Sequence, residues 1–350
     1  MWWQLRALWG TSTHKGAISG MAYSSWNVID YTEHLPKMFL LRSPQMLQTL
    51  ERALRMDIPE SLKIYGTVFH MNHGNPFKLE ALVDRWPNFK TVIVRPREQD
   101  MTDDLDPYTN AYQVYSKDLQ NCQEILKSSD VINWKQHLQI QGLQYGLNEV
   151  INNVAEEKSV QVKATNRYLY LISETMRRHA PSQQNVDKSL KTEKPKRDFN
   201  REMFKMSSLD VEHASLVNNL WSFGGNQKSL KFIQRCIQHF PSYCILGPEG
   251  TPVSWDLMDQ TGEMRMAGTL PEYRRLGLIS HILYQQIQDM DKLGYPIYCH
   301  VARDNQDMQR IGEKMKKIIA PCSWLQWNCE PLGASAVKES ESQSRGSGSS

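Results

Sequence analysis

The spacing of apolar and polar residues predicts alternating helices and strands in the first half of the chain. Apolar residues follow Ser43-Pro44 at helical spacing, and proline favours the first helical turn, so a helix is expected there. Alternating or β-branched apolar runs predict strands. The expected helices lie at residues 44–54, 75–86, 117–127 and 145–157, and the expected strands at residues 63–70, 91–95 and 167–172.

The pattern becomes more regular after residue 210. Asp210 is expected to cap a helix that runs to Trp221, because aspartate is a preferred N-cap. A strand that carries Glu263 leads into a basic loop. The other helices are expected at residues 229–240, 278–293 and 305–317, and the other strands at residues 243–247, 253–258, 296–301 and 324–332.

Composition divides the chain into two predicted domains and three further segments. Residues 181–201 are rich in lysine and other polar residues with little that can be buried, which predicts a linker. The domains are therefore expected at residues 38–180 and 202–332. Residues 1–37 form an N-terminal extension. The serine- and glycine-rich residues 333–350 are expected to be a disordered tail.

Charge and composition argue against several classes of protein. The 350 residues include 41 basic and 38 acidic side chains, a net charge of +3, unlike the strongly basic face of a nucleic-acid-binding domain. No apolar run approaches the roughly 20 residues of a membrane-spanning helix. The six cysteines show no Cys-x-x-Cys pair and no zinc-ligand spacing. We therefore expect no nucleic-acid partner, no membrane span and no metal site.

The most informative segment is the basic loop between Gly262 and Ile279. It predicts a strand, a turn marked by Pro271, a loop that ends at Gly277, and a helix. This order brings unpaired backbone N–H groups to the positive end of a helix dipole, where a phosphate binds favourably. A side chain at Gly277 would hold the phosphate away from those groups. An ordinary strand-to-helix turn with surface arginines is the alternative.

The loop sequence Pro-Glu-Tyr-Arg-x-x-Gly, residues 271–277, resembles the coenzyme A pyrophosphate loop of the GNAT superfamily of acyltransferases. The superfamily motif ends in a small residue where this chain has Ile279. Residues 246–274 resemble one branch, the glycine N-acyltransferases, whose members also carry a larger aliphatic residue there. Further similarity to this family extends over residues 65–77, 98–104, 133–141 and 326–329.

The resemblance implies an α/β (α+β) chain of two domains. A GNAT-like N-terminal domain would precede a C-terminal GNAT-fold acyltransferase domain, and the element order predicted after residue 210 is that of the GNAT fold. The implied activity is that of an acyl-CoA:amino-acid N-acyltransferase, in which an acyl group such as benzoyl moves to the amino group of glycine by direct attack. Acyl-CoA is then a co-substrate, and no cofactor stays bound permanently.

The resemblance also assigns roles to individual residues. Glu263 is the general base, with a solvent-exposed glutamate at a strand edge as the alternative. Asn305 lies near the pantetheine arm, or serves only as a helix N-cap. The acid that protonates the leaving thiolate stays open among Tyr284, Tyr295 and Tyr298. Backbone groups at the thioester and pantetheine come from Met266, Ala267, Gly268 and Thr269, and the pyrophosphate is held by Arg274, Arg275, Gly277, Leu278 and Ile279.

The cellular setting rests on the same resemblance, which implies a mitochondrial location and conjugation of organic acids. The extension carries Arg6 and Lys15 but no acidic residue before Asp30, which is compatible with a mitochondrial presequence. An upstream extension without that role is the alternative, because Met38-Phe39-Leu40-Leu41 resembles the family's own start. We expect a monomer. A non-catalytic acyl-CoA-binding paralogue is the alternative function, and a protein acetyltransferase is a third.

Overall fold

The computed structural model describes residues 38–173 and 203–333. The predicted extension at residues 1–37, the predicted linker at residues 181–201 and all but the first residue of the predicted tail lie outside the described residues. All described residues belong to one compact unit. None of their helices has both the length and the apolar character needed to cross a bilayer.

Helices and strands alternate in both described segments. The first segment contains the helices α1 (Pro44–Arg55), α2 (Leu62–Asn72), α3 (Leu119–Leu126) and α4 (Leu147–Glu157), the 3-10 turn η1 (Glu98–Asp100), and the strands β1 (Phe39–Leu40), β2 (Leu79–Val83), β3 (Thr91–Pro96), β4 (Ala111–Ser116), β5 (Leu138–Gly142) and β6 (Val160–Leu171). The second segment contains the helices α7 (Ala214–Leu220), α8 (Gln227–His239), α9 (Leu278–Lys292) and α10 (Gln306–Lys314), the 3-10 turns η4 (Val211–His213) and η5 (Pro271–Tyr273), and the strands β7 (Lys205–Ser207), β8 (Ser242–Leu246), β9 (Pro252–Met258), β10 (Met264–Thr269), β11 (Tyr298–Val301) and β12 (Ile318–Pro331).

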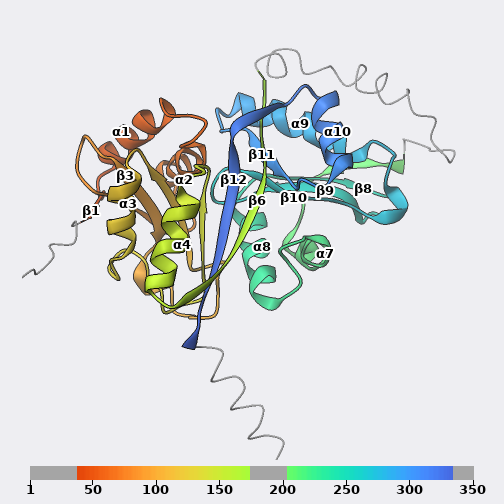
Figure 1. Ribbon diagram of the computed structural model, residues 1–350. Coiled ribbons are helices and arrows are strands. Elements are labelled where there is room, and N and C mark those ends of the chain that lie inside the picture. Colours follow the sequence, from red (N-terminus) through yellow and green to blue (C-terminus); the bar gives the residue numbers. More distant parts are fainter. Residues whose placement is uncertain (1–37, 174–202, 334–350) are drawn as a thin grey trace, which may run out of the picture. The chain divides into compact units, whose positions relative to one another are not determined.

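The described strands form one 12-stranded sheet in the order β1-β2-β3-β4-β5-β12-β6-β11-β10-β9-β8-β7. Strand β12, from the end of the second segment, therefore lies between β5 and β6 of the first. Strand β6 in turn pairs with β11, with Leu171 opposite Tyr298. Figure 1 shows β12 and β6 as two long strands side by side in the middle of the sheet. Strands of the two described segments are thus interleaved at the centre of the sheet.

Helices cover both faces of this sheet. In the second segment, α9 and α10 lie on one face, and α7 and α8 lie on the other (Figure 1). In the first segment, Val92 and Val94 of β3 belong to the core cluster that includes α1 and α2, whereas Ile93 belongs to the cluster with α3 and α4. This alternation is that of a strand buried on both faces.

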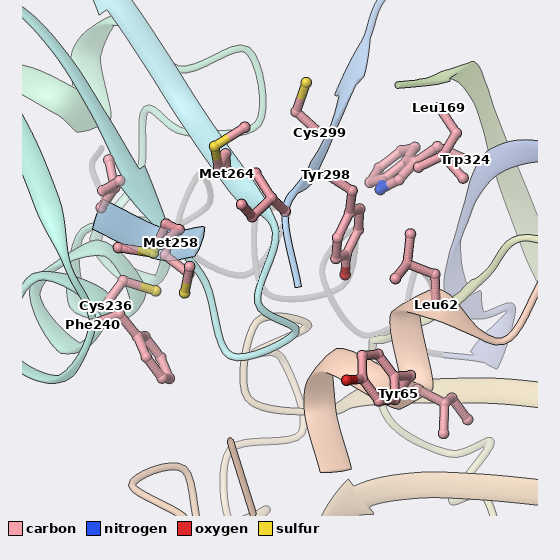
Figure 2. Close-up of a cluster of buried hydrophobic side chains, with 14 of the residues drawn as sticks. Leu62, Tyr65, Leu169, Cys236, Phe240, Met258, Met264, Tyr298, Cys299 and Trp324 are labelled. Carbon is pink, nitrogen blue, oxygen red and sulfur yellow. The ribbon is translucent and has the colours of Figure 1, made fainter. Parts of the chain in front are cut away.

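The expected strand at residues 63–70 is wrong, because this segment belongs to helix α2. Nearly every residue of α2 is buried, including Lys63, Thr67 and His70. A helix that is buried on all sides lacks the exposed polar stripe that makes the helical period visible. Figure 2 shows Leu62 of this helix near Tyr298 of β11 and Trp324 of β12, within one hydrophobic cluster. Helix α2 therefore packs against strands of the second segment.

The expected helix at residues 75–86 is also wrong, because its central part is strand β2, which pairs with β1 and β3. The apolar residues of this segment fit a helical spacing, but they also alternate, and the sheet satisfies the second pattern. Asn75 has a φ of 46°, and its side-chain amide bonds both the N–H and the carbonyl of Leu79 at 2.8 Å. These bonds close a turn in place of a helix start.

The remaining predicted helices are confirmed, as are the other predicted strands. Four further strands are not predicted from the sequence. Strands β1 and β7 have only two and three residues, and buried glutamines interrupt the pattern of the other two: Gln113 in β4, and Gln139 and Gln141 in β5. Strand β6 begins earlier than expected, at Val160, and β12 begins at Ile318. The element order from α7 to β12 agrees with the order predicted for the GNAT fold.

Candidate active site

The parallel strands β10 and β11 are joined at a single register position. Met264 of β10 pairs with Cys299 of β11, although β10 continues to Thr269 and β11 to Val301. The two strands therefore diverge after this pair. Backbone groups on this side of β10 are left without a neighbouring strand, and each such group needs a hydrogen-bonding partner. The divergence creates a place where backbone groups can bind a ligand.

A β-bulge shapes the diverging part of β10. The register with β9 shifts between residues 265 and 268, and Met266 has a φ of 65°, a left-handed conformation that is uncommon for a residue other than glycine. Ala267 is exposed at the bulge. A Cβ atom at Gly268 would lie 2.7 Å from the indole ring of Trp255. The bulge therefore turns backbone groups of residues 266–268 away from the regular ladder.

The basic loop connects β10 to α9 as the sequence predicts. Arg274 donates its Nε–H to the carbonyl oxygen of Thr269 at 3.2 Å, which ties the loop to the end of β10. The side chains of Arg274 and Arg275 are exposed. Gly277 has a φ of 77° and directly precedes α9. Two exposed guanidinium groups therefore lie close in sequence to the start of a helix.

The first residues of α9 contribute backbone groups to the loop. The side chains of Leu278 and Ile279 pack in a small core with Ile245 and Val253. The first N–H groups of a helix have no partner within the helix, and the dipole makes that end positive. Because the Ile279 side chain lies in this core, the absence of a small residue at this position is compatible with an anion at the loop.

Asn305 is the N-cap of α10, since its side-chain oxygen accepts a hydrogen bond from the backbone N–H of Met308 at 3.1 Å. The residue is exposed and follows β11 in sequence. The capping role is therefore present, and a contact with pantetheine stays a prediction.

Glu263 directly precedes β10 and is fully buried, which contradicts the alternative of a solvent-exposed glutamate. Its Oε2 accepts hydrogen bonds from Nζ of Lys63 at 2.7 Å and from Nε1 of Trp324 at 3.0 Å. Its Oε1 is bonded to Nδ1 of His300. Burial raises the pKa of Glu263, but Lys63, His300 and Arg265 together outweigh burial and hold this pKa well below its ordinary value. The carboxylate is ionised at neutral pH.

His300, on β11, lies between Glu263 and Arg167. Its Nδ1 faces Glu263, and its Nε2 lies 3.3 Å from Nη1 of Arg167. The ring stacks on Trp324 with a centroid distance of 4.1 Å. Burial lowers the pKa of His300 to about 4, with Glu263 opposing this shift and Arg265 and Arg167 adding to it. The imidazole is therefore neutral at pH 7.

Helix α2 brings Lys63 to Glu263 from a distant part of the sequence, and Gly66 permits this close approach. A Cβ atom at Gly66 would lie 2.0 Å from the carbonyl oxygen of Thr261, in the turn before Glu263. The same carbonyl accepts a hydrogen bond from the hydroxyl of Tyr298 at 2.8 Å. Of the three tyrosines considered for the thiolate acid, Tyr298 is thus fully buried and engaged in this turn.

We expect Gly66→Ala to lower the free energy of unfolding by about 1–3 kcal/mol, the usual cost of overpacking a core. The added methyl group would meet a backbone oxygen, which cannot rotate away, so α2 must shift and draw Lys63 from Glu263. Urea unfolding and turnover measure the two effects. Gly312→Ala is the control, since the nearest atoms to its Cβ would be those of the Tyr170 ring, at 3.0 Å, and a side chain can shift. Equal unfolding midpoints for the two variants would contradict the close contact.

Arg265 forms a second buried ion pair next to this cluster. Its Nη1 lies 3.0 Å from Oδ2 of Asp259, and both side chains are almost completely buried. The guanidinium lies over the rings of Trp221 and Phe223 at 5.2 and 5.4 Å, and its Nη2 donates to Oε1 of Gln326 at 3.3 Å. Its buried Nε has no hydrogen-bonding partner in the described part of the chain.

A cavity of about 350 Å³ lies beside Arg265, between the first and second segments. The side-chain oxygens of Gln141 and Gln260 are buried there without a hydrogen-bonding partner in the residues described. Such groups are available to a small polar ligand, because buried polar groups are normally paired. The cavity also has an aromatic wall formed by Tyr108, Trp221, Phe223 and Phe232.

The sequence predicts Glu263 and the loop but not the residues that contact Glu263. Lys63, His300 and Trp324 come from three elements far apart in the sequence, so no local motif contains them. The available signal is weak: Lys63 is one charge in an otherwise apolar stretch, and His300 lies in a predicted buried strand.

The fold and the site together define an acyltransferase. The bulged strand β10 diverges from its parallel neighbour β11 next to a buried carboxylate, and a basic loop leads to a glycine at the start of α9. Comparison with known proteins then gives the family. Residues 38–241 match the family described as aralkyl acyl-CoA:amino acid N-acyltransferase, and residues 243–331 match its C-terminal region. The chain belongs to the aralkyl acyl-CoA:amino acid N-acyltransferase family.

Individual relatives are similar over their whole length. Glycine N-acyltransferase of Bos taurus is 59% identical over 295 residues, covering 84% of this chain and 100% of the relative. Glycine N-acyltransferase of Homo sapiens is 59% identical over 296 residues with the same coverage. Glycine N-phenylacetyltransferase of Bos taurus is 57% identical over 295 residues, again covering 84% and 100%. An X-ray structure of a Drosophila protein has the same fold, with a TM-score of 0.63 at 13% identity, covering 84% of this chain and 98% of that chain.

Proposed function

We propose that this chain transfers an acyl group from acyl-CoA to the amino group of glycine and releases free coenzyme A. The names of the close relatives support glycine as the acceptor. A protonated amine cannot attack a thioester until a base removes a proton, and a positioned base contributes about 10²–10⁴-fold to such a step. The negative charge of Glu263 makes this removal of a proton from the amine favourable.

The position of Glu263 is the observation that carries the proposal. The residue lies one position before the pair Met264–Cys299, after which β10 and β11 diverge. In the proposed complex the pantetheine arm lies between the diverging strands, with the thioester near the bulge at Met266 and the pyrophosphate at Gly277. N–H groups of the bulge then stabilise the oxyanion of the tetrahedral intermediate, at about 3 kcal/mol per donor.

The acyl group in the proposal is aromatic, such as benzoyl. The aromatic wall of the cavity supports this choice: Trp221 stacks on Phe232 with a centroid distance of 6.0 Å and an interplanar angle of 19°, and Tyr108 lies 6.0 Å from Trp221. A contact between two aromatic rings contributes more free energy of binding than the area that it buries.

We expect Trp221→Ala to lower kcat/KM for benzoyl-CoA by about tenfold, which corresponds to the loss of one favourable aromatic contact. The value for acetyl-CoA should change much less, because an acetyl group is too small to reach the ring. Measuring both thioesters on the same variant makes acetyl-CoA the internal control. An equal loss for both thioesters would place the acyl group elsewhere.

A thiol-release assay tests the proposed activity directly. Benzoyl-CoA, phenylacetyl-CoA and acetyl-CoA are each combined with glycine, glutamine and other amino acids, and free coenzyme A is followed with a thiol reagent. We expect release that depends on glycine. Binding of acyl-CoA without release for any acceptor would instead support the alternative, a non-catalytic acyl-CoA-binding protein.

The proposal includes a monomeric enzyme in mitochondria, a location supported by the family resemblance and by the composition of residues 1–37. Fluorescent fusions of the full chain and of a chain that begins at Met38 test the location. Mitochondrial signal for the full chain and its loss for the shorter chain are expected. Identical cytosolic signal for both would contradict the location.

A further inference from the structure

Arg167 of β6 is a half-buried cation beside His300. Its guanidinium lies over the ring of Phe223 at 4.4 Å and within 5.9 Å of the ring of Trp324. Its Nη2 lies 3.4 Å from the hydroxyl of Ser222. Across the residues that the structure describes, no carboxylate lies within ion-pair distance of Arg167. Lys63 and Arg265, by contrast, each have a buried carboxylate partner.

The neighbours of His300 determine which of its nitrogens carries the proton. An ionised carboxylate has no proton to donate, so Nδ1 of His300 must carry the hydrogen that is shared with Glu263. A guanidinium has donors and no acceptor, so Nε2 must present a lone pair to Arg167. Nε2 of His300 therefore carries the lone pair of the ring, and the hydrogen bond from Nδ1 to Glu263 fixes the orientation of the ring.

We propose that Arg167 and His300 together bind the amino-acid acceptor, with its carboxylate on Arg167 and its amine at Nε2 of His300, where the amine takes the place of the Arg167 Nη1 group. This inference rests on the proposed function and names the acceptor site within it. The two protein groups are 3.3 Å apart, and the carboxylate and amine of an α-amino acid are separated by a single carbon. One small molecule therefore reaches both groups. A planar guanidinium also matches a carboxylate with two parallel hydrogen bonds.

The same geometry assigns the proton transfers. The ammonium group of the acceptor gives one proton to Nε2 of His300, and Glu263 stabilises the resulting imidazolium. The neutral amine then attacks the thioester carbon, so a C–N bond forms and the C–S bond breaks. The nitrogen loses a second proton as the intermediate collapses, and the leaving thiolate takes it to give free coenzyme A. His300 returns its proton to solvent. Glu263 acts through His300 and is a positioning residue in this scheme.

Aromatic rings around the two groups favour a small acceptor. Trp324 stacks on His300 at 4.1 Å, and the ring of Phe223 lies 6.4 Å from the His300 ring. A side chain on the α-carbon of the acceptor would meet one of these rings. Glycine has no side chain, so the site is most compatible with glycine.

Arg167→Met tests the carboxylate contact, with Arg303→Met as the matched control. Arg303 is an exposed arginine that lies over Tyr168 at 4.4 Å. We expect Arg167→Met to raise KM for glycine by about 10–100-fold, the loss of one charged hydrogen-bonded contact, with KM for benzoyl-CoA unchanged. Glycinamide, which lacks the carboxylate, separates binding from general damage: wild type and Arg303→Met prefer glycine, and Arg167→Met loses this preference. Arg167→Lys keeps a cation and should retain part of it.

His300→Gln tests the proton acceptor at saturating glycine, where kcat should fall at least about 100-fold while benzoyl-CoA binding by calorimetry stays unchanged. If the wild type turns over glycine, and if both Arg167→Met and Arg167→Lys keep the full preference for glycine over glycinamide, the acceptor site is wrong and the proposed function stands. Near-normal kcat in His300→Gln overturns the assignment of the base. A wild type that binds acyl-CoA but acylates no amine removes the proposed function and this inference together.

Discussion

Replacing Glu263 with glutamine is expected to lower kcat by about 10²–10⁴-fold, because His300 then no longer acts as a positioned base, which contributes this much to the rate. Glutamine keeps the shape of the side chain but carries no negative charge to stabilise an imidazolium at His300. Its amide also offers a donor to Nδ1 of His300, which favours the opposite tautomer and removes the lone pair from the substrate side. Affinity for acyl-CoA should stay nearly unchanged, because the loop at Gly277 is not altered. Single-turnover kinetics and calorimetry measure the two quantities.

The same substitution leaves the buried ammonium of Lys63 without its counter-ion, so a control for stability is needed. Removing one partner of a buried pair costs about 3–5 kcal/mol, whereas replacing both partners is often nearly neutral. The double variant Lys63→Met/Glu263→Gln should therefore regain much of the stability that Glu263→Gln loses. It should not regain activity. Recovery of kcat in the double variant would show that the single variant fails through unfolding.

The pH dependence of Glu263→Gln gives an independent check. The pKa of Glu263 is held well below its ordinary value, so the carboxylate stays ionised through the neutral and alkaline range. The fraction of acceptor that arrives as a neutral amine grows as pH rises, and that fraction needs no base. The ratio of wild-type to variant kcat should therefore shrink with rising pH. A ratio that is equally large at every pH would assign Glu263 to acceptor positioning alone.

Gly277→Ala is expected to weaken acyl-CoA binding by about 10–100-fold, because hydrogen bonds from the helix start to the pyrophosphate are lost. Gly277 has a φ of 77°, so alanine also introduces about 1–2 kcal/mol of backbone strain. Gly294→Ala is the matched control: its φ is 70°, and a Cβ atom there would meet open space. Both variants should lose similar stability in thermal unfolding. Equal dissociation constants for benzoyl-CoA would remove the loop from the binding site.

The part of the site that could be predicted from the sequence is the part that is continuous in the chain. The strand, the turn at Pro271, the glycine and helix α9 follow one another, and turn chemistry and periodicity read such local order directly. The surroundings of Glu263 are assembled by tertiary contacts from α2, β11 and β12. The distance between Lys63 and Glu263 along the chain hides their pairing, so the sequence could indicate a carboxylate but not its partners.

Helix α2 illustrates a second limit. Its polar and apolar residues alternate although nearly all of them are buried. Nζ of Lys63 donates to Glu263, and the hydroxyl of Thr67 donates to the carbonyl oxygen of Lys63 at 2.8 Å. These internal bonds allow polar side chains to be buried, so polarity no longer reports exposure. The segment then matches the period of a strand for a reason unrelated to a sheet. Buried glutamines mask β5 in the same way, since Gln139 donates to the carbonyl of Pro107 at 2.6 Å.

The place of β12 between β5 and β6 bears on how the protein is made by the ribosome. Both neighbours of β12 are synthesised long before it. During that time β5 has one edge without its native partner, and β6 lacks a partner on both edges until β11 is made. At about 5–20 residues per second, the delay is on the order of ten seconds or more. Unpaired edges are templates for aggregation. The exposed edges of β5 and β6 can therefore pair with other chains until β12 has left the ribosome.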